Sequence, residues 1–128
     1  MWADPGDSDA LERSTAAGVS EAFREAHPEA VDRIVEWRAA EDADRSTFEA
    51  HAAAVASFDV SDRLYEITPP ALVVHGDSDG IWPPGRGRAL AEGLPRGEFR
   101  SVEAAGHLVH VEASRRVNDE VFGFLAEV

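Results

Sequence analysis

ALVVHGDSDGIWPP (residues 71–84) is the stretch of sequence that decides the fold. Its first four residues are apolar and two of them are β-branched, which is typical of a strand buried on both faces of a parallel sheet. A loop with two prolines follows, and a helix is expected over residues 88–94. FRSV (residues 99–102) has the composition of a second strand, and a last helix is expected from Ser114 onward. This order of strand, loop, helix, strand, loop and helix predicts a parallel α/β sheet.

The N-terminal part predicts helices instead. The first helix is expected over residues 14–26, and the second begins at Pro28, because proline is favoured at the first helical position. A third helix is expected from Ser46, which forms a capping box with Glu49. Residues 1–13 are rich in Asp, Gly and Ser and are interpreted as a frayed lead-in.

The change in pattern near Phe58 suggests two parts. We expect a lead-in and a helical segment over residues 1–57, and an α/β part over residues 58–128. Two parallel strands need further strands beside them to form a stable sheet. The α/β part is therefore expected to be the end of a larger α/β sheet.

Two loops carry the candidate chemistry, and each follows a predicted strand. Asp79 lies in the first loop and His107 in the second. Loops at the carboxyl ends of parallel strands build the sites of open α/β sheets, so the two side chains should converge. A carboxylate there would hold the imidazole in one tautomer, and the other ring nitrogen would act as a general base on a nucleophile.

These features together resemble the C-terminal third of the α/β-hydrolase family. The resemblance rests on a strand ending in HG, on Asp79 followed by Pro83-Pro84, and on Gly106-His107 with Glu112 shortly after. It implies an α/β-hydrolase fold whose C-terminal portion, two parallel strands with flanking helices, follows a helical cap (lid) segment. It also implies that Asp79 is the triad acid and His107 the triad base of an esterase-like or lactonase-like enzyme. The substrate would be a small ester or lactone, and no cofactor and no metal are implied.

The sequence offers no convincing counterpart of the family's nucleophile. The family places it earlier in the chain, in G-x-S-x-G on a sharp turn between a strand and a helix. GDSDG (residues 76–80) matches that pattern, but Pro83 and Pro84 prevent a helix directly after Ser78. Ser78 is therefore rejected, and the chain alone is expected to be inactive. The alternative is a non-catalytic remnant, or a half-domain that associates with another chain.

Several other side chains have more than one interpretation. Asp77 could be the triad acid in place of Asp79, and Asp79 could instead be only a turn residue. Trp82 either lines a substrate pocket or packs in the core. None of the remaining histidines is expected to be catalytic: His75 ends a strand and bonds locally, and His110 either supports the site or is structural. His27 and His51 lie on separate helices and form no pattern of metal ligands.

Composition limits partners and location rather than chemistry. The 128 residues contain no cysteine, and 25 acidic residues face 12 basic ones, all arginine, for a formal charge of −13. This charge repels nucleic acid and anionic lipid, and no apolar run is long enough to span a membrane. The absence of lysine and the dispersed acidic residues resemble proteins of salt-accumulating halophiles; an acidic protein from a GC-rich genome is the alternative. No secretory signal is apparent, so a cytoplasmic protein is expected. The chain is expected to associate either with itself or with a missing N-terminal half.

Overall fold

The computed structural model describes residues 2–128, which fall into two compact units. The first unit comprises residues 2–17 and 21–59, and the second comprises residues 18–20 and 60–128. The short segment 18–20 thus belongs to the second unit although its flanking helices belong to the first. Within residues 2–128, no helix is both long and apolar enough to cross a membrane.

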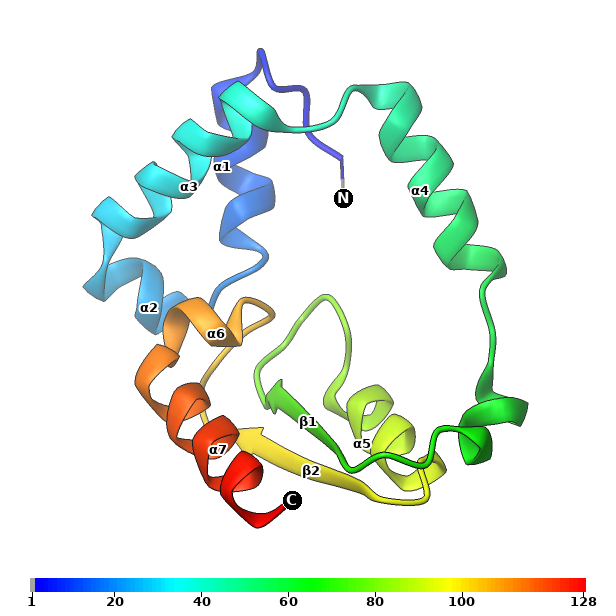
Figure 1. Ribbon diagram of the computed structural model, residues 1–128. Helices are drawn as coiled ribbons and strands as arrows, with labels where there is room; N and C mark the ends of the chain where they lie inside the picture. The colour runs from blue at the N-terminus through cyan, green and yellow to red at the C-terminus, as the bar shows by residue number, and fades with distance from the viewer. Residues whose placement is uncertain (1) are drawn as a thin grey trace. The chain divides into compact units, whose positions relative to one another are not determined.

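The first unit is helical. Its elements are α1 (Ser8–Ala16), α2 (Glu21–Ala26), α3 (Pro28–Glu41) and α4 (Arg45–Ser57) (Figure 1). α3 begins at Pro28, as predicted.

The expected first helix over residues 14–26 is wrong. α1 begins at Ser8, inside the presumed lead-in, because the Asp7 carboxylate accepts a hydrogen bond from the Ala10 amide and caps the helix. α1 ends at Ala16, and α2 begins only at Glu21.

The expected capping box at the third helix is also wrong. Asp44 caps α4 instead, since its carboxylate accepts the Thr47 amide. Several Asp and Ser residues compete for the cap positions of this polar sequence, so spacing alone selected the wrong one.

A small core joins α1 to α3. Leu11 of α1 is fully buried, and Val31 of α3 and Thr15 of α1 are buried as well. The guanidinium of Arg38 donates to Ser14 Oγ at 2.7 Å and to Thr15 Oγ1 at 2.9 Å, which fixes α3 against α1. These hydrogen bonds satisfy the partly buried charge of Arg38.

The second unit contains the sheet. It runs from a 3₁₀ helix η1 (Ser61–Glu66) through β1 (Ala71–Gly76), α5 (Pro84–Gly93), β2 (Gly97–Val102), α6 (Val109–Glu112) and α7 (Ser114–Glu127). β1 and β2 are parallel, from the pair Ala71–Gly97 to the pair Gly76–Val102. The predicted strands and the last helix are confirmed. The crossover helix is longer than expected, because Pro84 occupies its first position instead of delaying it.

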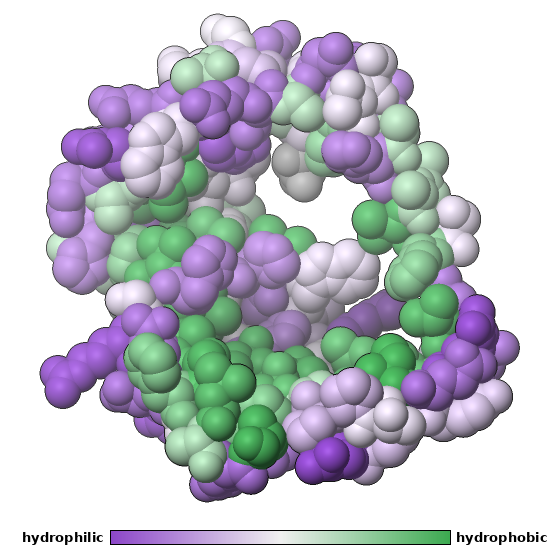
Figure 2. Space-filling model, viewed as in Figure 1, coloured by the Kyte–Doolittle hydropathy of each residue, from purple (hydrophilic) through white to green (hydrophobic). Residues whose placement is uncertain are grey.

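The sheet is less covered than the strand sequence implies. Residues 71–75 of β1 are half-buried, not buried on both faces as expected. In the part of the chain that the structure describes, β2 is the one strand paired with β1, so each strand keeps a free edge. α7 also leaves Phe122 and Leu125 exposed, at 71% and 59%, and Figure 2 shows apolar side chains gathered over this helix. This apolar surface is available for further packing.

Candidate active site

The carboxyl ends of β1 and β2 bring the two candidate loops together. The Asp77 amide donates to Val102 O, and the Ser78 amide donates to Ala105 O, both at 3.0 Å. Gly76 makes this approach possible, because a Cβ at that position would overlap Ala105 O and the neighbouring carbonyl of the same loop. The parallel pairing thus places the loop after β1 directly beside the loop after β2.

Asp79 is held by the turn that it begins. Its Oδ1 accepts the amides of Ile81 at 2.8 Å and Trp82 at 2.9 Å, and its side chain is 3% exposed. Burial raises the pKa of Asp79, but the hydrogen bonds from the Trp82 amide, His107 and the Ile81 amide outweigh burial, and the pKa lies below its ordinary value. The carboxylate is therefore ionised at neutral pH. Asp79 is therefore both a turn residue and a partner of histidine, so its two sequence interpretations apply together.

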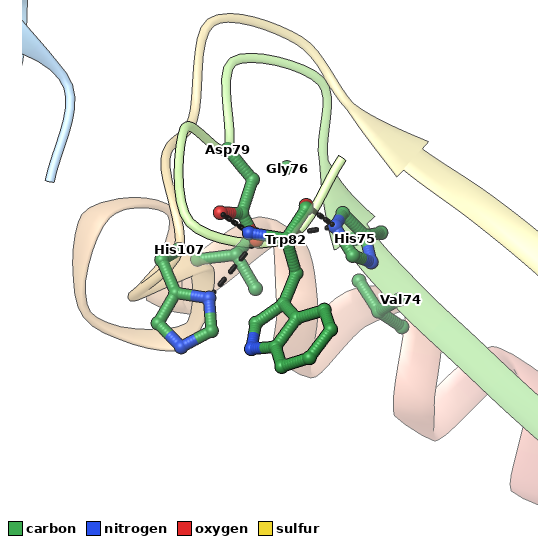
Figure 3. A pocket seen from close by; sticks show the side chains of 7 residues that line it. Val74, His75, Gly76, Asp79, Trp82 and His107 are labelled. Carbon is green, nitrogen blue, oxygen red and sulfur yellow. Dashed lines mark hydrogen bonds and ion pairs between the residues drawn. The ribbon is translucent and has the colours of Figure 1, made fainter. Parts of the chain in front are cut away.

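His107 lies on the other side of the same carboxylate. Its Nδ1 lies 2.9 Å from Asp79 Oδ2, as Figure 3 shows. An ionised carboxylate can only accept, so Nδ1 carries the proton, and in the neutral ring Nε2 keeps its lone pair. The His107 side chain is 37% exposed, so this second nitrogen is in reach of another group.

A cavity of about 220 Å³ opens beside this pair. Asp79, His107 and Trp82 line it together with His75, Gly76 and two valines, Val74 and Val109. Trp82 thus lines a pocket, which was one of its two sequence interpretations.

The His107 loop is anchored by Glu112 in a way that the sequence did not reveal. Its carboxylate accepts the Gly106 amide at 2.9 Å and the Ser20 amide at 3.0 Å. The Leu108 amide also donates to Gly18 O at 2.8 Å. Segment 18–20 therefore holds both sides of His107, although it lies almost ninety positions earlier in the chain. No periodicity or motif relates two segments so far apart.

Asp77 does not take the place of Asp79. Its Oδ1 accepts the Ala104 amide at 2.7 Å and the hydroxyl of Ser78 at 3.0 Å. Ala104 has a φ of 57°, which alanine seldom adopts, and the hydrogen bond to Asp77 holds that conformation. Asp77 thus fixes the base of the His107 loop, and the Ser78 hydroxyl is directed at this carboxylate.

The remaining histidines lie elsewhere, apart from His75. His27 and His51 belong to the helical unit, and His110 is exposed on α6. His75 bonds locally, as expected, since its Nε2 lies 2.9 Å from Trp82 O. Among residues 2–128, no three His, Asp or Glu side chains are grouped as ligands of a metal ion.

The fold defines a class of protein. Solved structures that superpose on nearly the whole chain are α/β-hydrolases, so the chain has the fold of the C-terminal portion of an α/β-hydrolase. No protein-family model matches the chain.

Three particular proteins show the likeness. A thermophilic esterase from Thermogutta terrifontis is 28% identical, with a TM-score of 0.78 over 91% of this chain and 43% of its own. The enol-lactonase from Burkholderia xenovorans LB400 is 24% identical, with a TM-score of 0.78 over 93% of this chain and 45% of its own. A 2-hydroxy-6-oxononadienedioate/2-hydroxy-6-oxononatrienedioate hydrolase from Paraburkholderia phymatum is 38% identical over 69 residues, 54% of this chain and 24% of its own. The match therefore spans about a quarter of that curated relative and less than half of the two solved structures.

Proposed function

We propose that this chain supplies the acid and the general base of a nucleophile–histidine–acid triad, in a hydrolase of esters, lactones or related small substrates. The observation that carries the proposal is the 2.9 Å contact between Asp79 Oδ2 and His107 Nδ1 at the edge of a cavity. The likeness to an esterase, a lactonase and a further hydrolase supports the reaction class.

The residues divide the work as their geometry suggests. Asp79 keeps the proton of His107 on Nδ1, so that Nε2 accepts the proton of an attacking hydroxyl. The imidazolium that results faces an ionised, buried carboxylate, which stabilises the positive charge. His107 then returns the proton to the leaving group, and Trp82 forms an apolar wall for the substrate.

The nucleophile is proposed to come from a segment other than residues 2–128. Ser78 matches G-x-S-x-G, but its hydroxyl bonds to Asp77, and the next helix begins only at Pro84. A nucleophile on a sharp turn between a strand and a helix would need a further parallel strand. The free edge of β1 is the place where we propose that the sheet continues towards this strand.

The helical unit is proposed to be the cap over the substrate. The esterase and the lactonase both superpose on more than nine-tenths of this chain, so helices are included in the likeness.

A second candidate function is a half-domain that binds another chain without catalysis. The observation that favours it is the exposed apolar side of α7, which includes Phe122 and Leu125. Such a surface promotes association whether or not the site is active. The two proposals differ in whether His107 is needed after association.

A chimera tests the catalytic proposal. In it, residues 2–128 would take the place of the 43% of the Thermogutta terrifontis esterase that they match, and the rest of that esterase would be kept. We expect hydrolysis of a small activated ester that falls at least about a hundredfold in His107→Ala and in Asp79→Asn, because a positioned general base contributes 10² to 10⁴ in rate. His110→Ala is the matched control, since His110 is exposed outside the cavity.

The outcomes separate the two candidates. A folded chimera that hydrolyses the ester equally well without His107 would contradict the triad and leave the half-domain. Residues 2–128 alone should show no more ester hydrolysis than the His107→Ala variant. Turnover that disappears in Ser78→Ala would instead make Ser78 the nucleophile.

A further inference from the structure

Asp79 contacts a second imidazole, which a triad does not require. His75 Nε2 lies 3.1 Å from Asp79 Oδ2, the same oxygen that His107 Nδ1 approaches at 2.9 Å (Figure 3). His75 lies at the end of β1, one residue before the glycine that lets the two loops meet. One carboxylate oxygen thus lies between two histidines, one from β1 and one from the loop after β2.

The proton on His75 can be placed from its other contact. Its Nε2 lies 2.9 Å from the backbone carbonyl of Trp82, which can only accept. Nε2 therefore carries the proton and donates to Trp82 O, with Asp79 Oδ2 at 3.1 Å on the same side. Both acceptors belong to the turn that holds the Asp79 carboxylate.

His75 has little room to move. Its side chain is 14% exposed, and α5 passes close to its other ring nitrogen. A Cβ on Gly87 would lie 2.5 Å from His75 Nδ1 and 3.2 Å from Phe99 Cε2, so glycine is needed to accommodate the ring. A ring fixed in this way keeps its Nε2 on Trp82 O and beside Asp79 Oδ2.

We propose that His75 is a positioning residue for the acid: its Nε2–H donates to Trp82 O, and its ring, 3.1 Å from Asp79 Oδ2, confines the turn that presents the carboxylate to His107 Nδ1. The role as part of a triad rests on the proposed function, but the hydrogen-bond arrangement does not. The backbone amides of Ile81 and Trp82 hold Oδ1, whereas His107 bonds to Oδ2 and His75 Nε2 lies 3.1 Å from it. Without His75, the carboxylate can rotate about the Oδ1 contacts, and His107 loses its single orientation.

The test determines the tautomers of His75 and His107 directly, in a chain labelled with ¹⁵N-histidine. Long-range ¹H–¹⁵N correlation spectra at neutral pH should show His75 with its proton on Nε2 and His107 with its proton on Nδ1. In His75→Phe the ring shape remains but the donor is lost, and we expect the protection of the His107 Nδ1 proton against exchange to fall about fivefold to tenfold, the equivalent of one hydrogen bond. His75→Gln restores a donor and should recover most of that protection. His110→Phe is the control for loss of an exposed imidazole.

Each outcome of these measurements either supports or contradicts the positioning role of His75. A wild-type His75 with its proton on Nδ1 would overturn the proposal, because Nε2 could not then donate to Trp82 O, and this result needs no variant that folds. Unchanged protection of His107 in a folded His75→Phe would reduce His75 to a packing role. In the active chimera, His75→Phe should lower kcat about tenfold with KM unchanged, the rate equivalent of about 1.4 kcal/mol. An inactive chimera with the expected tautomers would contradict the proposed function and leave the positioning of Asp79 intact.

Discussion

Gly76→Ala should disconnect the two loops of the site while leaving both strands in place. A Cβ at residue 76 would overlap the carbonyl oxygens of Ala105 and Gly106 and lie 2.7 Å from the Ala105 carbonyl carbon. These are backbone atoms, which cannot rotate away as a flexible side chain can. The loop that carries His107 must therefore move from the end of β1.

The cost follows from the contacts that this movement breaks. The added methyl group overpacks the contact, which costs about 1–3 kcal/mol. Displacing the loop also weakens the hydrogen bonds from the Asp77 amide to Val102 O and from the Ser78 amide to Ala105 O, at about 1 kcal/mol each. We expect a loss of about 3 kcal/mol in the free energy of unfolding, which lowers the Tm by roughly 10 °C in a chain of this size.

Thermal unfolding followed by circular dichroism measures the loss, and imidazole NMR of His107 measures the disconnection. Gly80→Ala and Gly85→Ala are matched controls, since a Cβ at either position meets nothing within 4 Å. Gly85→Ala lies in α5 and should even stabilise the protein by about 0.4–1 kcal/mol. A Gly76→Ala variant as stable as Gly80→Ala, with its His107 signals unchanged, would refute the close approach of the two loops.

Three further predictions concern charge and anchoring. Asp79→Asn should lose about 1–3 kcal/mol of stability at pH 7. Because the pKa of Asp79 is lowered in the folded state, the stabilisation by its carboxylate is present above the ordinary pKa near 4 and is lost on acidification. Urea unfolding at pH 3 should therefore show a much smaller difference between the variant and wild type, and an equal difference would contradict the ionised state. Sedimentation velocity should show larger assemblies or more compact forms as salt rises from about 0.05 to 2 M, because salt screens the −13 charge that opposes contact through Phe122 and Leu125; a compact monomer at every concentration would argue against it. Glu112→Gln keeps one acceptor for two backbone amides and should lose about 1 kcal/mol, whereas Glu127→Gln at the exposed end of α7 should be neutral in the same melts.

The parts of the fold that were predicted correctly are those with a local physical cause. The strand ALVVHG is set by its apolar, β-branched composition, and α3 begins at Pro28 because a fixed φ suits the first helical position. The first helix was misplaced because the cap at Asp7 was not recognised, so that α1 begins at Ser8. At α4 the start was close to the prediction, but Asp44 caps the helix in place of Ser46.

The site divides along the same line. Asp79 and His107 could be named from the sequence because each follows a strand, and parallel strands bring such loops together. The anchoring role of Glu112 could not, since its partner Ser20 lies 92 positions away and belongs to a segment with no pattern of its own. The role of His75 was visible only in part: its place at the strand end predicts a local contact, but the shared carboxylate oxygen depends on where the loop after β2 lies.

The two members of the pair are held by supports of different range. Asp79 is fixed by amides two and three positions away and by His75 four positions earlier, all within one strand and its turn. His107 depends on the distant segment 18–20 through Glu112. Local contacts form with little loss of chain entropy, whereas contacts across a long loop need the rest of the unit to be folded. Loosening of this unit should therefore free His107 before it disturbs the turn of Asp79, and the order in which their signals change on mild denaturation follows from the sequence distance of their partners.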